Sequence, residues 1–526
     1  MRVRALWDKS QMSFTGFILL FGVINFALYH LPLMKYSVAH IENLNGSGVL
    51  ILLTVAIAAI LLSAFLIGIF GLLSVRLMRG LAIIFTLINS VALYFILTYK
   101  VILTRAMMGN VFNTNQAEST ELFSFSMILY LLFLGIIPAI LLYKIPIRPA
   151  RFLRKIGVLA GVLGIALAWG FINSHTWLWF DKNSKNIGGL TLPWAYVING
   201  IRHGIDTMKP REVKKLSALT FKDPQQKQIV VLVIGEAARR DRFSLYGYQK
   251  ATNERLSQER IELFPNATSC ATYTTAGVAC MLSHKGASRG MFDSDEPLPS
   301  YLHRFGVDVL WRSNNWGEMP LEISAYERVQ DLQNSATQNG HSVASGHDEL
   351  LLYGLKERIE NFQSNKIFVV LHQSGSHGPK YYAKYPPSFE RFSPVCRSVE
   401  LKSCSSEELN NAYDNTIVYT DYLLSELIKT LRTLAIPAVM LYISDHGESL
   451  GESGFYLHGA PNAIAPSYQR AIPFIVWMSD EFRAMRNLNA PLQKKDAYSQ
   501  DYIFHSVLGA FGATSQEYNP SLDIFR

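Results

Sequence analysis

Three short apolar runs in the second half of the chain each lead into a residue type that binds metal ions or phosphate. The runs are Ile229–Ile234, Ile367–Leu371 and Ala438–Ile443, and the residues that follow them are Glu236, His377, Asp445 and His446. Unbroken runs of this length, rich in β-branched residues, predict strands buried on both faces of a parallel sheet. Ligands of open α/β sheets bind outside the carboxyl ends of the strands. We therefore expect these four side chains to converge, which indicates an enzyme.

The residue types at these positions suit a metal ion. Aspartate oxygens and imidazole nitrogens are good zinc ligands, so Asp445-His446 at a strand end predicts a metal site. Glu236 is either a further ligand or a cap of the segment that follows its strand. His377 and His458, each taken alone, are typical of ordinary loop histidines. Several such positions at expected strand ends together favour a site.

A nucleophile is offered by the threonine-rich segment at residues 269–283. It contains Thr272, Thr274 and Thr275, and the run Ala276–Leu282 after them could form a helix that a threonine caps. A helix amino terminus favours a bound phosphate, because its free N–H groups and its dipole point at the anion. A zinc ion can activate a threonine oxygen for attack. An ordinary capping threonine is the alternative if the metal ligands are absent.

The first third of the chain has the composition of a membrane domain. The chain has 526 residues and is 49% hydrophobic, which is too long and too apolar for one soluble domain. Five segments are long and apolar enough to span a bilayer. They are Phe14–Leu33, Val49–Val75, Gly80–Tyr99, Phe123–Tyr143 and Ile156–Asn173. The first lacks a small-residue cleavage site, so we expect it to be retained.

Basic residues predict the orientation of these spans. Arginine and lysine residues gather before the first span, between the second and third, and between the fourth and fifth. The positive-inside rule then places the amino terminus in the cytoplasm and everything after Asn173 outside it. The formal net charge of +8 comes largely from these loops, so it indicates topology and not binding of nucleic acid.

All four cysteines follow the last span, where an oxidising compartment favours disulfides. Three pairings are possible, and we expect the two local ones, Cys270–Cys280 and Cys396–Cys404. Zinc binding by the thiolates is the alternative, but the spacing is not C-x₂-C.

The composition divides the chain into three parts. We expect a membrane domain of five helices at residues 1–174, a linker at 175–225 and a globular α/β domain at 226–526. Within the linker, Trp194–Ile205 could lie along the membrane as an amphipathic helix. In the globular domain, Glu407–Leu434 is typical of a helix that alternates with the strands.

Five motifs occur together in one known family. They are IGEAARRDRFSLYGYQKATNERL at 234–256, SCATYTTAGVACMLS at 269–283, GSHGPKYYAKYPPSFERF at 375–392, NAYDNTIVYTDYLL at 411–424 and SDHGESLGESGFYLHGAPNAIAP at 444–466. With them the chain resembles the bacterial phosphoethanolamine transferases of the alkaline-phosphatase and sulfatase superfamily, most closely the lipid A branch. The resemblance covers nearly the whole length.

The resemblance implies a particular site in an alkaline-phosphatase-like fold, with a mostly parallel central sheet between helices. Thr274 would be the nucleophile. Glu236, Asp445 and His446 would hold the principal zinc ion together with it. His377 and His458 would line the pocket of the donor phosphate, where they could act as general acid and base or bind a second, weaker zinc ion.

The resemblance also implies two lipid substrates. Phosphoethanolamine would pass from phosphatidylethanolamine through Thr274 to a phosphate of lipid A in lipopolysaccharide, at the inner membrane and with the catalytic domain in the periplasm. The transfer would lower the negative charge of the outer membrane and favour resistance to polymyxin and cationic peptides. Asn110, Thr114 and Glu118, spaced to share one helix face, would contribute to the substrate pocket with Asn315. We expect a monomer.

The segment at 310–322 departs from the family pattern. Asn315 is kept, but Trp316 and Met319 replace a polar and a basic position, and one disulfide of the relatives is missing. This leaves other acceptors open, such as a core sugar of lipopolysaccharide, a pilin or a periplasmic glucan. Thr275, beside Thr274, is the alternative nucleophile.

Two other classes of protein remain as alternatives. One is a membrane-anchored phosphodiesterase or sulfatase, although the C-x-P-x-R signature of sulfatases is absent. The other is a non-catalytic membrane sensor that has kept the fold, against which the intact ligand set argues.

Overall fold

The structure is a computed structural model that describes residues 11–41, 46–113, 120, 122–208, 212–290, 293–339, 346–462, 464–488, 490–492 and 494–526. The chain divides into two compact units, Met1–Lys209 and Pro210–Arg526. The first is helical and the second is built around a sheet.

Apolar helices long enough to cross a membrane make up most of the first unit. Four of them lie in its described part: α4 at Gly46–Leu73, α5 at Val75–Tyr99, a continuous helix at Phe125–Lys144 (α8, η1 and α9), and α10 at Phe152–Ile172. The helices α2 (Phe14–Tyr29) and α3 (Leu31–Ala39) meet at 64° and make a fifth span if they are counted as one. Counted in this way, the described part has the five predicted apolar helices before the sheet domain.

The bend between α2 and α3 has a local cause that the hydropathy pattern does not reveal. Pro32 lies in the first turn of α3, where its missing N–H costs nothing but where it prevents α2 from continuing. The predicted span Phe14–Leu33 therefore ends earlier as a straight helix, at Tyr29.

Polar side chains of the helical unit are buried among the helices and bonded to one another. Asn25 Nδ2 donates to Ser63 Oγ at 2.9 Å, and Asn89 Nδ2 donates to Asn25 Oδ1 at 2.7 Å. The residues that follow α10 form α11 (Trp177–Leu190) and α12 (Trp194–Met208). The helix α12 includes the predicted Trp194–Ile205, and its Ile201 and Ile205 side chains are exposed.

A seven-stranded sheet forms the centre of the described second unit, in the order β3-β11-β8-β2-β7-β5-β6. The strands are β2 (Gln228–Gly235), β3 (Ile261–Leu263), β5 (Asp308–Ser313), β6 (Ala325–Arg328), β7 (Lys366–His372), β8 (Ala438–Ser444) and β11 (Phe474–Met478). Five neighbours from β8 to β6 are parallel, and β11 is antiparallel to both β8 and β3. The three predicted apolar runs are β2, β7 and β8, buried at every position.

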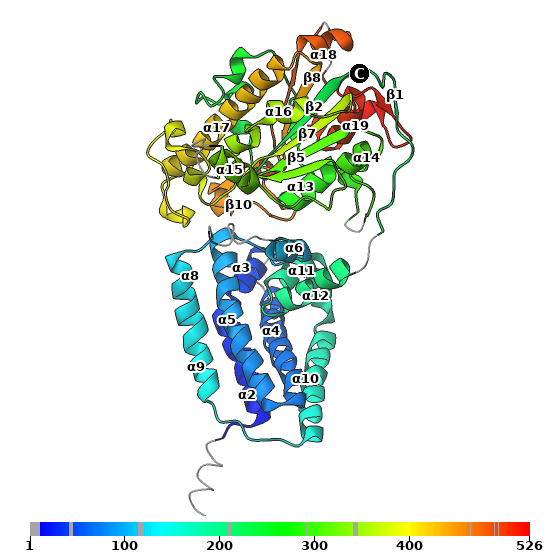
Figure 1. Ribbon diagram of the computed structural model, residues 1–526. Helices are drawn as coiled ribbons and strands as arrows, with labels where there is room; N and C mark the ends of the chain where they lie inside the picture. The colour runs from blue at the N-terminus through cyan, green and yellow to red at the C-terminus, as the bar shows by residue number, and fades with distance from the viewer. Residues whose placement is uncertain are drawn as a thin grey trace, which may run out of the picture. The chain divides into compact units, whose positions relative to one another are not determined.

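Two hydrophobic cores cover the two faces of this sheet, because alternate residues of each strand point to opposite faces. Ile234 packs with α13 (Thr274–Met281), α14 (Leu298–Arg304) and α19 (Asp501–Ala510), whereas Val233 packs with α16 (Leu355–Glu360) and α17 (Ser406–Thr433). Figure 1 shows these two groups of helices on either side of the sheet. The predicted helix Glu407–Leu434 is α17, which a capping box of Ser405 and Glu408 starts.

Both expected disulfides are present. Cys270 is bonded to Cys280 and Cys396 to Cys404, which leaves no free thiol in the chain.

Candidate active site

The central strands β2 and β8 bring the first two candidate ligands together. They are parallel neighbours, and Gly235 at the end of β2 lies opposite Ser444 at the end of β8. A side chain at Gly235 would approach Tyr442 Oη to 2.6 Å, so only glycine fits there. Glu236 directly follows β2 and Asp445 directly follows β8, and Asp445 N donates to Gly235 O at 2.9 Å. Residues more than 200 positions apart thus become neighbours.

The helix α13 brings the threonine to these carboxylates. Its first residue is Thr274. Its Gly277 lies so close to the end of β8 that a Cβ there would be 2.5 Å from Asp445 O. Thr274 Oγ1 donates to Glu236 Oε2 at 3.1 Å and lies 3.5 Å from His446 Nε2. Of the three threonines in the segment, Thr274 is therefore the one whose hydroxyl contacts Glu236 and His446.

Three potential ligand atoms face one another, and two of them, both carboxylate oxygens, lack hydrogen-bond partners among the described residues. His446 Nε2 lies 3.2 Å from Glu236 Oε1 and 3.3 Å from Asp445 Oδ2, and all three side chains are fully buried. Within the described ranges, neither carboxylate oxygen has a hydrogen-bond partner. The other imidazole nitrogen, Nδ1, is 2.8 Å from Gly447 O, which fixes the ring so that Nε2 faces the carboxylates.

The charges of this cluster call for a cation at its centre. Burial opposes ionisation of His446, but the Asp445 and Glu236 carboxylates raise its pKa to about 10. Burial and the neighbouring Glu236 charge raise the pKa of Asp445, whereas His446 holds the pKa of Glu236 well below its ordinary value despite burial. A proton or a metal ion between these atoms meets the same need, and carboxylate, imidazole and alkoxide donors suit zinc.

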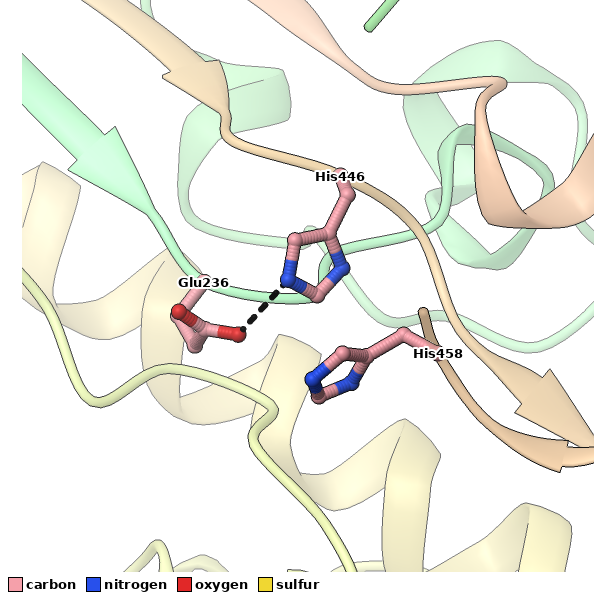
Figure 2. A group of neighbouring side chains, drawn as sticks. All are labelled: Glu236, His446 and His458. Carbon is pink, nitrogen blue, oxygen red and sulfur yellow. Dashed lines mark ion pairs between the residues drawn. The ribbon is translucent and has the colours of Figure 1, made fainter. Parts of the chain in front are cut away.

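Two more histidines lie beside the cluster. Figure 2 shows Glu236, His446 and His458 facing one another, and their ligand atoms lie within 4.8 Å. The His377 ring lies 5.3 Å from that of His458. Burial lowers the pKa of His377 to about 3, so it is neutral at pH 7. The predicted convergence of Glu236, His377, Asp445 and His446 is therefore seen in the structure, with His458 added.

Neighbouring residues that sequence reasoning missed hold these groups in place. Glu448 is fully buried, with its Oε2 3.3 Å from His458 Nδ1. Gln500 Nε2 donates to the Asp445 carbonyl at 2.7 Å. Glu448 lies in the motif around Asp445 and could have been singled out, but Gln500 carries no signal in the sequence.

The predicted substrate residues are found in different places. Asn315 Nδ2 donates to Glu236 Oε2 at 2.7 Å, so it belongs to the cluster. Asn110 lies on α6 (Arg105–Asn113) in the helical unit, where α6 packs against α12. Thr114 and Glu118 lie outside the described residues.

Comparison with known families first defines the class. A family model described as sulfatase matches residues 228–513, and one described as phosphoethanolamine transferase EptA/EptB matches residues 61–207. The second unit is therefore a sulfatase-type α/β domain.

Individual relatives then show which family within this class the chain belongs to. Phosphoethanolamine transferase EptA of Helicobacter pylori is 40% identical over 97% of this chain and 96% of its own. The integral membrane lipooligosaccharide phosphoethanolamine transferase A of Neisseria meningitidis has a TM-score of 0.85 at 26% identity, covering 97% of both chains. The C-terminal periplasmic domain of EptC from Campylobacter jejuni is 37% identical, with a TM-score of 0.52 over 60% of this chain and 98% of that one. The chain belongs to the phosphoethanolamine transferase family.

Proposed function

We propose that the chain transfers phosphoethanolamine from phosphatidylethanolamine to a phosphate group of lipid A, with Thr274 as the covalent carrier. The observation that carries the proposal is the Thr274 hydroxyl, 3.1 Å from Glu236 and 3.5 Å from His446 at the start of α13. Two relatives support the substrates by their names. They are phosphatidylethanolamine transferase Mcr-1, 30% identical, and Kdo(2)-lipid A phosphoethanolamine 7''-transferase, 26% identical, both of Escherichia coli.

In this proposal Glu236, Thr274, Asp445 and His446 would hold one zinc ion, and His377 and His458 would line the pocket of the donor phosphate as general acid and base. A second, weaker zinc ion on these two histidines is the alternative to their acid–base role. When bound, zinc would stabilise the threonine oxygen as an alkoxide and offset charge on the phosphate. The two carboxylate oxygens that lack partners among the described residues support this ligand set.

The side chains divide the remaining work between two steps. Thr274 would lose its hydroxyl proton to solvent when the metal binds. Its Oγ1, oriented by Glu236, then attacks phosphorus, and the bond from phosphorus to the glycerol oxygen breaks to release diacylglycerol. His458, whose Nδ1 faces the buried Glu448 carboxylate, gives the departing oxygen its proton. The acceptor phosphate is already anionic, so it attacks phosphorus without a base. The bond from phosphorus to Thr274 Oγ1 breaks, and the threonine oxygen departs in the alkoxide form that bound zinc would stabilise.

The proposal includes a topology and a division of the chain. Residues 1–174 would lie in the inner membrane with the amino terminus in the cytoplasm. Residues 175–225 would connect this membrane domain to residues 226–526, which would form the periplasmic catalytic domain of a monomer. Asn110, Thr114 and Glu118 would contribute to the substrate pocket. Amine groups added to lipid A would reduce attraction of polymyxin to the outer membrane.

Mass spectrometry of the full-length protein in detergent tests the covalent step. After incubation with phosphatidylethanolamine and zinc but no acceptor, we expect the mass of one phosphoethanolamine on the peptide with Thr274. The Thr274→Ala variant should carry none, and Thr275→Ala should carry the same amount as the wild type. Release of diacylglycerol without any adduct would instead indicate direct hydrolysis.

The acceptor is tested separately by adding lipid A, core oligosaccharide or a periplasmic glucan to the modified protein. Loss of the adduct and gain of the same mass on lipid A is the expected result. Transfer only to another acceptor would keep the enzyme class but contradict the lipid A assignment.

A further inference from the structure

The loop after β5 runs close to the proposed nucleophile. Asn315 donates to Glu236, and Gly317 follows with a φ of +100°. A Cβ at Gly317 would lie 3.5 Å from Thr274 Cγ2 and 3.1 Å from Thr275 Cγ2. This loop is also where the sequence departs from the family pattern, at Trp316 and Met319. The residue between Gly317 and Met319 is Glu318, which the site described so far does not use.

Glu318 carries a buried carboxylate that is only half satisfied. Its side chain is 10% exposed, and its Oε1 accepts a hydrogen bond from Tyr326 Oη. Its Oε2 has no hydrogen-bond partner among the residues that the structure describes. The nearest basic group is His372 Nδ1 at 3.7 Å, too far for a good hydrogen bond.

His372 lies beside Glu318, and Trp311 lies beside His372. His372 ends β7 beside Ser313 at the end of β5, is fully buried, and has no hydrogen-bond partner for either ring nitrogen in the described part of the chain. The Trp311 ring lies edge-on to it, with centroids 5.9 Å apart. Unpaired buried groups each cost about 1–3 kcal/mol, so such a group of them next to a nucleophile points to a missing partner.

The chemistry of Glu318 and His372 indicates which kind of ligand group would satisfy them. They offer a carboxylate oxygen and an imidazole lone pair, and within the described ranges no lysine or arginine forms an ion pair with Glu318. An ammonium group has three donors, a positive charge and no acceptor, so it can satisfy both of these acceptors. An anion or a neutral apolar group would leave the Glu318 oxygen unpaired.

We propose that Glu318 and His372 bind the ammonium group of phosphoethanolamine while its phosphate is at Thr274. The assignment rests on the proposed function, because it concerns the same transferred group. Ethanolamine places its nitrogen only two carbons from the ester oxygen, and Glu318 follows Gly317, where an added Cβ would lie 3.5 Å from Thr274 Cγ2. In this role Glu318 makes the donor site prefer a cationic head group.

Binding of two small probes to the zinc-loaded, full-length protein in detergent tests the pocket by calorimetry. O-phosphoethanolamine and ethyl phosphate share the phosphate, but only the first has an ammonium group. We expect the wild type to bind O-phosphoethanolamine at least about tenfold more tightly, as one charge-assisted contact allows. Glu318→Gln should lose that preference and keep its affinity for ethyl phosphate, which also shows that it is folded.

The matched control is Glu322→Gln, four residues further along the same loop, where the side chain is 78% exposed and pairs with Lys215. This variant should bind both probes as the wild type does. Equal binding of both probes by the wild type would overturn the ammonium pocket, as would an equal loss of both in Glu318→Gln, which a purely structural Glu318–His372 pair predicts. If the wild type bound neither probe, the proposed function itself would be contradicted and the pocket with it.

Discussion

Glu236, the carboxylate that contacts the nucleophile, is also held by a side chain from the loop after β5. Asn315 Nδ2 lies 2.7 Å from Glu236 Oε2 and 2.9 Å from the carbonyl oxygen of Gln373, so it holds Glu236 from a fixed backbone point. Hydrogen bonds to charged groups contribute about 1.5–3 kcal/mol. The position of Glu236, and through it of Thr274, therefore depends on a residue that need not touch the phosphate.

Asn315→Ala should slow the transfer by about 10- to 100-fold, because that hydrogen-bond energy is lost where the nucleophile is oriented. Rates of transfer from phosphatidylethanolamine at saturating zinc measure the effect. Asn339→Ala, which removes an exposed hydrogen bond to Tyr353, is the control and should not change the rate. A wild-type rate in Asn315→Ala would show that Glu236 needs no such support.

A second residue-level prediction concerns acid stability. Burial lowers the pKa of His505 to about 4, and its Nδ1 accepts the N–H of Asn519 at 3.1 Å. The unfolded chain binds this proton near pH 6.5, so the stabilisation is complete above that pH and is lost as pH falls toward 4.

The loss should amount to up to about 3 kcal/mol, since one pKa unit corresponds to 1.36 kcal/mol. Melting temperatures of the wild type and His505→Asn, compared at pH 7 and pH 4.5, would show it. The asparagine offers an oxygen to the same N–H but does not titrate, so the variant should lose less stability on acidification. Parallel losses in both proteins would contradict the assignment.

At the scale of elements, the site exists because α13 meets the end of β8 without a side chain between them. Gly277 allows this approach, since a Cβ there would lie 2.5 Å from the Asp445 carbonyl oxygen. The helix thus places its first residue, Thr274, at the cluster while its other end packs in the core on that face of the sheet.

Gly277→Ala should shift α13 away from the strand end and reduce transfer by at least about 100-fold, because a misplacement of about 1 Å can cost that much. Gly290→Ala, where the nearest atom would be at 3.4 Å, is the control and should remain active. The two variants should be compared by adduct formation on Thr274 and by melting temperature. Normal adduct formation in Gly277→Ala would mean that the helix can move without cost.

Sequence patterns predicted the strands of the site better than they predicted the loops. The strands β2, β7 and β8 could be predicted because both of their faces are buried, which gives unbroken apolar runs. The functional residues after them could be predicted because parallel sheets bind ligands at the carboxyl ends of their strands. Asn315 could be named only through the family motif. Glu318, Gln500 and the contact of Gly277 depend on which distant segments pack together, and nothing in local periodicity encodes that.

At the scale of the whole molecule, zinc should contribute to folding stability. A ligand at 100 times its Kd stabilises a protein by about 2.7 kcal/mol. We therefore expect chelation to lower the melting temperature by several degrees and zinc to restore it. Asp445→Asn should abolish the response, whereas Asp480→Asn, whose side chain is 93% exposed, should keep it. An unchanged melting temperature on chelation would argue against a bound metal.

The topology can be tested with introduced thiols, because all four native cysteines are paired. Pro149→Cys, in the basic loop before α10, should be protected from an impermeant maleimide in intact spheroplasts. Lys182→Cys, on α11 after the last span, should be labelled. The reverse pattern would contradict the positive-inside assignment.

The pairing of Cys270 with Cys280 closes the segment that contains the first two turns of α13, and with them Thr274. This closure forms only where thiols are oxidised, so the reactive segment should acquire its fixed shape after export and not before. The disulfide would thus keep Thr274 out of its reactive arrangement in chains that have not yet left the reducing cytoplasm.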